Sequence, residues 1–411
     1  MSEKSYRLYP YRWVVLAVFM LINIAMQMLW ITYAPITGIA AKFYGVTDLQ
    51  IGFLSMTFMI AFIPLSLPVS WLIDTIGFRR TVSIGAVLMA LCAISRGLAG
   101  ANYTLVLIST IGLAIAQPTM LNAWTKVPAL WFGHEERATA VGMITLSALV
   151  GTALGMVLTP MLVDSLPIPS VQLIYGAIAA GTALLFLIFA REKPATPPCE
   201  AGQEDRSLML DGLKHALSIH NFWFYLIIMF IGLGIFNGVT TWVETIIRPR
   251  GFTATDAGIL GALMLAGGVL GAVIIAPISD KFHKRQAFLL FGFAMAIPCV
   301  LGLAFAHHQF ALFTFSFALG FFLVSVNPVG MQYASEITQP TPEGTSNGLV
   351  QLAGQLSVVF VYLMDALKTP DGSYTPALLF SVGLLILSLF FISKMKDPAP
   401  AVREEPGHQV I

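Results

Sequence analysis

Twelve long apolar stretches run through this chain of 411 residues, and the charged residues fall almost entirely between them. Hydrophobic residues make up 57% of the sequence and charged residues 10%, whereas soluble domains contain about 25% charged residues. A helix that crosses a bilayer needs about 20 consecutive apolar residues. We therefore predict an all-α polytopic membrane protein with twelve transmembrane helices. The predicted helices are 12–38, 50–74, 81–99, 103–127, 138–163, 169–190, 221–247, 256–279, 286–306, 309–335, 344–367 and 374–394.

The longest polar interval separates the apolar stretches into two groups of six. It covers residues 191–220 and contains acidic residues, basic residues and three prolines. We predict an N-terminal six-helix bundle over 1–190 and a C-terminal six-helix bundle over 221–396, with the interval as a polar linker loop between them. Residues 397–411 are predicted to form a polar tail.

Lysine and arginine are distributed unevenly between the two sets of loops. Most of them fall on the side of the two termini, and the opposite side has Lys42, Arg96, Arg248, Arg250 and Lys368. Cytoplasmic loops carry the excess of these residues in membrane proteins. The linker, the tail and both termini are therefore predicted to be cytoplasmic, in a plasma (inner) membrane.

Composition and cysteine spacing argue against several other kinds of protein. The net charge of +1 gives no sign of a nucleic-acid partner. Cys92, Cys199 and Cys299 are too widely spaced for a zinc motif or a disulfide framework. No nucleophile with a base and no phosphate loop stands out, so we expect no enzymatic activity, no metal and no cofactor. The expected partners are a small-molecule substrate and the lipid bilayer.

A weak internal repeat supports the division into halves. Asp74 and Asp280 open the loops after the second and eighth helices, and 280 − 74 = 206. Parallel repeats related by an axis along the membrane normal are typical of carriers that rock two bundles. Six residues of these two loops carry the pattern: Asp74, Gly77, Arg79, Arg80, Asp280 and Arg285.

The run 74–80, Asp-Thr-Ile-Gly-Phe-Arg-Arg, resembles the signature between the second and third helices of the major facilitator superfamily. The resemblance implies the major facilitator fold, alternating access and a monomer. It also implies that the six loop residues form a cytoplasmic latch. In such a latch the aspartates cap or pair with a neighbouring helix end, and the arginines pair with acids of the facing bundle. The alternative is that Arg79 and Arg80 only fix the topology.

Four further blocks carry a closer resemblance. They are 30–36, Trp-Ile-Thr-Tyr-Ala-Pro-Ile; 63–72, Ile-Pro-Leu-Ser-Leu-Pro-Val-Ser-Trp-Leu; 129–133, Ala-Leu-Trp-Phe-Gly; and 336–344, which opens Glu-Ile-Thr-Gln-Pro. With Tyr-Gly-Val at 44–46, they resemble the feline leukaemia virus subgroup C receptor-related transporters. That family is associated with choline and ethanolamine transport and with haem export.

The resemblance also implies particular site residues. The family's choline site places a tryptophan of the first helix over the quaternary ammonium, and Trp30 stands at the matching position. A glutamine of the eleventh helix matches Gln355. Two positions differ, because Leu149 stands where the family has a glutamine and Asn237 where it has a tyrosine. These two differences leave choline itself an open question.

Polar side chains inside the predicted helices give candidates independently, since such residues face a cavity or a partner helix. Those of the first helix are spaced by three or four residues and share one face. The alternative for all of them is helix–helix packing. The remaining candidates are Asn23, Gln27 and Tyr33 with Trp30 in the first helix, Asn122 in the fourth, Asn237 in the seventh, and Gln351 with Gln355 in the eleventh.

Acidic residues are missing from the middle of the predicted helices. Glu244 and Asp365 lie near the outer surface, where Arg248 and Lys368 are expected to pair with them. A proton-coupled carrier usually keeps a titratable group in its core. We therefore predict a facilitative carrier of a small amine or quaternary-ammonium cation, which Trp30 holds by cation–π attraction.

Three alternatives remain open at this point. One is an exporter of haem or another large amphipathic solute, which the 18 methionines and 29 phenylalanines would suit. Another is a proton-coupled symporter of an organic solute. The third is a membrane receptor that does not transport.

Overall fold

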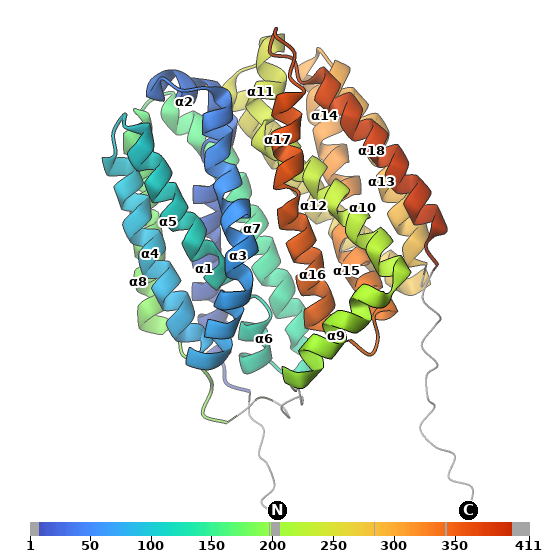
Figure 1. Cartoon of the computed structure of the whole chain (residues 1–411). Coiled ribbons are helices and arrows are strands. Elements are labelled where there is room, and N and C mark those ends of the chain that lie inside the picture. Colours follow the sequence, from blue (N-terminus) through green and yellow to red (C-terminus); the bar gives the residue numbers. More distant parts are fainter. Residues whose placement is uncertain (1–7, 197, 199–205, 283, 342, 397–411) are drawn as a thin grey trace, which may run out of the picture.

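The computed structural model describes residues 8–196, 198, 206–282, 284–341 and 343–396, and the side chains at 134, 138, 206–211, 280, 343–345 and 347 lie outside this description. The described part of the chain forms helices and turns, without a strand (Figure 1). Twelve of its helical segments are long and apolar enough to cross a membrane. This confirms the predicted all-α polytopic architecture.

The first six spanning segments form one bundle. α1 starts on the same side of the molecule as α18 finishes, which we call the terminal end, and the opposite side is the distal end (Figure 1). The helices of this half are α1 (Arg12–Ile31), η1 (Ala34–Ile36), α2 (Thr37–Tyr44), α3 (Asp48–Ile76), α4 (Phe78–Leu98), α5 (Tyr103–Leu121), α6 (Lys126–Trp131), α7 (His134–Val163) and α8 (Ile168–Phe189).

The second half follows a linker that is partly helical rather than a loop throughout, because α9 (Arg206–Ser218) lies within it at the terminal end (Figure 1). The helices of this half are α10 (His220–Thr241), α11 (Val243–Ile247), η2 (Arg248–Arg250), α12 (Ala254–Phe282), α13 (Arg285–Phe305), α14 (Gln309–Leu319), the π-helical turn η3 (Gly320–Val324), α15 (Val326–Ile337), α16 (Glu343–Leu356), α17 (Val358–Ala366) and α18 (Thr375–Lys394).

Each half has an apolar core of its own. One cluster of buried side chains, centred on residues such as Phe19 and Phe78, lies wholly within the first half. A larger cluster contains Phe293 and most of the second half's buried side chains, and it also takes in Met56 and Met156 of the first half. The two bundles therefore pack against each other along a seam.

Helix capping reveals the internal repeat more clearly than the loop residues do. Thr47 accepts a hydrogen bond from the backbone N–H of Gln50 and donates its own N–H to the Gln50 side chain, so that α3 begins with a capping box. Thr253 and Asp256 form the same reciprocal pair at the start of α12. Since 253 − 47 = 206, the caps support the repeat of 206 residues.

The first and seventh spanning segments, each predicted as a single helical range, are interrupted. α1 ends at Ile31 and the chain resumes as η1 and α2, while α10 ends at Thr241 and resumes as α11. The second break falls at Trp242 and not at the nearby glycines, which serve close packing instead. A Cβ on Gly238 would lie 2.2 Å from the sulfur of Met364.

The fourth, tenth and eleventh segments are also discontinuous. α5 ends three residues after Pro118, and the π-helical turn η3 precedes Pro328. Proline has no N–H to donate to the carbonyl four residues earlier, so the backbone near it departs from regular α-helix. The eleventh segment breaks at Ser357, between α16 and α17. Discontinuous helices in both halves are a feature of carriers whose site lies between repeats.

Candidate substrate site and gates

Trp30 is held firmly at the seam between the two bundles. Its indole Nε1 donates to the backbone oxygen of Ser55 on α3 at 3.3 Å, and the Ser55 hydroxyl donates back to the Trp30 carbonyl at 3.3 Å. The half-buried ring packs against both apolar clusters. A ring that keeps part of its surface accessible and is fixed at its N–H end is available for contact with a ligand.

Arg96 fixes the backbone on either side of Trp30. Its guanidinium donates to the Leu29 carbonyl at 3.0 Å and to the Thr32 hydroxyl at 3.5 Å, and lies 5.4 Å from the ring centre of Tyr33. The prediction that Arg96 is a loop charge was wrong, because it lies inside α4 and is 1% exposed. The break after Ile31 frees carbonyls of the last turn of α1, and the buried guanidinium supplies donors for them.

Gln27 lies one turn before Trp30 on α1. Its side-chain oxygen is buried and has no hydrogen-bond partner among the described residues. Leaving a buried acceptor unpaired costs about 1–3 kcal/mol. The amide is therefore ready to accept a hydrogen bond from a bound solute or a water molecule.

Gln355 lies on the facing bundle, two residues before the break at Ser357. It is half-buried, and the hydrogen bonds described for the chain include none to its amide or to that of Gln351. Asn237 of α10 donates to the Ser357 hydroxyl at 3.3 Å, so it supports the break. The uncharged amide of Gln355 therefore lies next to the point where α16 ends and α17 begins, with no hydrogen bond among those described.

The chain of contacts from Trp30 leads towards Gln355. Ser55, which holds Trp30, is followed by Met56, and Met56 lines a common groove with Val358 of α17. Val358 follows Gln355 by three residues, or about one helical turn. The predicted proximity of Trp30 and Gln355 stays a prediction, supported by the packing of Trp30 against the apolar clusters of both halves.

Three predicted site residues have other partners inside the first half. Asn23 is buried, donates to Phe19 and accepts from Trp124. Tyr33 is 1% exposed, with its hydroxyl against that of Tyr44. Asn122 donates to the carbonyl of Ser66 and to the Ser70 hydroxyl. For these three the packing alternative is favoured, because their polar atoms are engaged within one bundle.

The distal end is closed by contacts between the bundles. The Glu244 carboxylate of α11 accepts a hydrogen bond from the backbone N–H of Gly38 at 3.1 Å. Arg248 pairs with Glu244 at 3.4 Å, as predicted, and also with Asp48 of α3. Gly38 and Glu244 are 206 residues apart, so equivalent points of the two repeats meet across the seam.

Trp242 seals the same end. Its ring is fully buried, it donates to the Val361 carbonyl at 2.9 Å, and a Cβ on Gly52 would lie 2.2 Å from it. We call these contacts the distal gate, which comprises Gly38, Asp48, Gly52, Trp242, Glu244 and Arg248. Sequence reasoning predicted its Glu244–Arg248 pair but missed the contacts that cross the seam. The available signal was the glycine pair, since each glycine leaves room for a large side chain of the opposite bundle.

Glu244 is the one acidic residue classed as buried within the described part of the chain, at 5% exposed. It lies beyond the spanning segment His220–Thr241. Burial raises the pKa of the Glu244 carboxyl, and the nearby Arg248 opposes that rise. The Asp365–Lys368 pair was also predicted and is present at 3.3 Å.

The loop after α3 makes its contacts within one half. Asp74 pairs with Lys126 at 2.7 Å. Glu192 accepts from the backbone N–H groups of Phe78 and Arg79, both at 2.8 Å. Gly77 has a φ of +96°, and a Cβ there would lie 2.6 Å from the Glu192 carboxylate, so glycine is required.

The contacts described for the remaining latch residues also lie within one half. Arg79 donates to the Leu187 carbonyl, and Arg80 is exposed. Arg285 pairs with Glu336 of its own half at 3.0 Å, and the Asp280 side chain lies outside the described residues. The ion pairs described at the terminal end thus stay within a half, whereas at the distal end the Arg248–Asp48 pair and the hydrogen bond from Gly38 to Glu244 join the halves. This conformation is closed distally, and the predicted pairing of the latch arginines with acids of the facing bundle stays a prediction.

The fold and the distal gate define an integral membrane carrier built from two bundles. The family model for the Major Facilitator Superfamily matches residues 15–361 and 244–410. The chain belongs to the major facilitator superfamily.

Curated relatives cover most of the chain. It is 31% identical to solute carrier family 49 member A3 of Danio rerio, over 91% of this chain and 82% of that protein. It is 29% identical to the choline/ethanolamine transporter FLVCR1 of Felis catus, over 94% of this chain and 73% of that protein. These matches confirm the resemblance to the receptor-related transporters.

A solved structure shows the same fold. It is the inward-facing, unoccupied crystal structure of a bacterial homologue of the human lysosomal transporter Spinster. The two share a TM-score of 0.77 at 16% identity, over 94% of this chain and 97% of that one.

Proposed function

We propose that this protein is a facilitative carrier of a small amine or quaternary-ammonium cation, working as a monomer by alternating access. In this proposal the protein lies in the plasma membrane with the terminal end in the cytoplasm. The observation that carries it is the setting of Trp30, half-buried at the seam with its N–H end anchored on Ser55. In this proposal two uncharged amides, Gln27 and Gln355, complete the site with the ring, and the hydrogen bonds described for the chain include no partner for the buried Gln27 oxygen.

Cation–π attraction is the physical basis of the proposal. A desolvated cation over a tryptophan face gains about 2 kcal/mol or more, and a quaternary ammonium has no N–H that would need an acceptor. Neutral amides orient its polar group without binding it as tightly as a carboxylate would. Such a site releases its substrate on both sides of the membrane.

The relatives support the substrate class but leave its identity to experiment. Several are named choline/ethanolamine transporters. Leu149 and Asn237 replace two of the family's site residues, and Asn237 here bonds to Ser357. We therefore propose the class of small amines, with choline and ethanolamine as the first compounds to test.

The test is uptake into proteoliposomes under imposed gradients. Radiolabelled choline and ethanolamine should enter faster when the interior is negative, because one charge crossing 100 mV is worth about 2.3 kcal/mol. A pH gradient alone should have no effect. Uptake that follows the pH gradient and ignores the potential would overturn the facilitative mechanism and favour the proton-coupled alternative.

The variant Trp30→Ala should abolish this uptake. Its matched control is Trp71→Ala, which removes a tryptophan of α3 that is 61% exposed. Equal loss in both variants would indicate damage to the fold and would count against a substrate role for Trp30.

A further inference from the structure

A groove on the side of the molecule crosses the seam between the two bundles. It has a volume of about 490 Å³ and is lined by α3 and α5 of the first half and by α17 of the second. That volume lies within the range of ligand pockets, about 300–1,000 Å³. Its lining residues do not include Trp30, Gln27 or Gln355 of the proposed substrate site.

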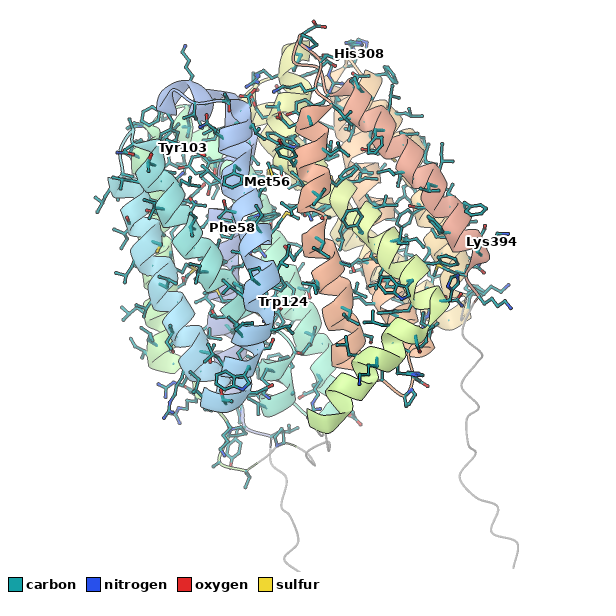
Figure 2. All side chains as sticks on the ribbon, viewed as in Figure 1. Met56, Phe58, Tyr103, Trp124, His308 and Lys394 are labelled. Atoms are coloured by element: carbon teal, nitrogen blue, oxygen red, sulfur yellow. The ribbon has the colours of Figure 1, made fainter. Side chains whose placement is uncertain are left out.

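The groove has a buried floor between exposed ridges. Met56 of α3 is 2% exposed and Val358 of α17 is 9% exposed, and they form the floor. Ile60 on one side is 43% exposed and Val359 on the other is 63% exposed. Figure 2 shows Met56 at this seam, facing α17. An occupant that touches Met56 must therefore lie between the ridges.

The lining is chemically suited to hydrocarbon. Its polar residues are Gln50, Tyr103 and Tyr362, and the Tyr103 hydroxyl donates to the Gln50 carbonyl at 2.6 Å. No charged side chain is among the lining residues described. Both walls belong to spanning segments, Asp48–Ile76 and Gly348–Ala366, so the groove opens towards the bilayer.

The length of the groove matches one leaflet. Along α3 its lining runs from Leu49, next to the distal start of the helix, to Ile60. Eleven residues rise by about 16 Å at 1.5 Å per residue, and half of a hydrocarbon core of about 30 Å is about 15 Å. We propose that this groove binds one acyl chain of a phospholipid from the distal leaflet.

The groove is continuous with the closed distal gate. Trp242 packs on Gly52 of α3 and donates to Val361 of α17, so the same two helices that line the groove are joined by the gate. If the bundles part distally, the two walls separate. A bound chain therefore stabilises the distally closed conformation, because it fits that conformation alone.

Photolabelling tests the proposal. The full chain is placed in phosphatidylcholine nanodiscs that contain phosphatidylcholine with a diazirine in one acyl chain, and labelled residues are mapped by mass spectrometry. Label on the floor residues Met56 and Val358 is the expected result. Lipid that only surrounds the protein would label ridges and exposed positions such as Ile84, which is 63% exposed on α4, and would leave the floor unlabelled.

A filled groove provides the control. Val359→Trp should cause loss of floor labelling, whereas Ile84→Trp, a matched change at an equally exposed position, should leave it intact. Floor labelling that survives Val359→Trp, or an unlabelled floor in the unaltered protein, would overturn the proposal. So would labelling of the floor by a diazirine cholesterol but not by the phospholipid. None of these readouts depends on transport, so failure here is distinguishable from failure of the proposed function.

Discussion

The distal gate makes a sharp prediction about Gly52. In Gly52→Ala the new Cβ would lie 2.2 Å from the nearest ring carbon of Trp242. The ring has no room to retreat, because it is fully buried, lies 5.8 Å from the ring centre of Tyr374 and is tied to Val361. Overpacking of this kind costs about 1–3 kcal/mol, and here the cost falls on the distally closed state alone.

Gly52→Ala is expected to shift molecules from the distally closed to the distally open conformation. The gain of about 1 kcal/mol from replacing glycine in a helix applies to both open and closed states, so it does not offset the clash. A cost of about 1–3 kcal/mol lowers the ratio of closed to open molecules by about 5- to 150-fold. Spin labels at Lys42→Cys and His307→Cys, one on the exposed distal surface of each half, should report a longer distance in double electron–electron resonance.

Gly142→Ala is the matched control. It adds a methyl group to a helical glycine of α7 that has no atom within 4 Å of the new Cβ. The distance distribution should not change in this variant. An unchanged distribution in Gly52→Ala as well would refute the gate as described.

Two further predictions concern buried charges. Arg96→Met should weaken choline binding about tenfold or more in an equilibrium binding assay. The variant loses the hydrogen bond to the Leu29 carbonyl, which costs about 1.4 kcal/mol or more and loosens the backbone beside Trp30. The control Arg80→Met, at an exposed position, should leave choline binding unchanged. Glu244 has a raised pKa in the closed gate and regains its ordinary value, about 4.3, once opening exposes it. The closed gate is then most stable at a pH below the ordinary pKa of Glu244 and loses stability as the pH rises through the raised pKa. The distance between the spin labels should therefore lengthen as the pH rises. Glu244→Gln should remove this pH dependence.

Hydropathy was enough to predict the architecture but not its interruptions. Every spanning segment was predicted near its observed place, since twenty apolar residues have few other stable arrangements. The breaks at Thr32 and Trp242 left no such signal. The first depends on a donor from another helix, because Arg96 of α4 satisfies the Leu29 carbonyl, and at the second Trp242 donates to the Val361 carbonyl of α17.

The site candidates were likewise predicted in part. Trp30 packs against the apolar clusters of both halves, and the cavity-facing positions of Gln27 and Gln355 stay predictions. Helical spacing cannot distinguish a cavity from a neighbouring helix, so Asn23 was included with them although it bonds to Trp124. The pairing of Gly38 with Glu244 was out of reach for a different reason. The hydrogen bond joins residues 206 apart in the sequence through a backbone N–H. Because glycine has no side chain, its residue type gives no sign that its N–H will bind a carboxylate.

The account rests on a cation held over Trp30, and choline against its uncharged isostere 3,3-dimethyl-1-butanol tests that most directly. The two have nearly the same shape and hydroxyl, so their affinity ratio isolates the charge. Cation–π attraction of about 2 kcal/mol predicts that choline binds about 30-fold more tightly, and that the ratio collapses in Trp30→Ala. Equal affinities in the unaltered protein, or a ratio that Trp30→Ala leaves intact, would contradict the central claim.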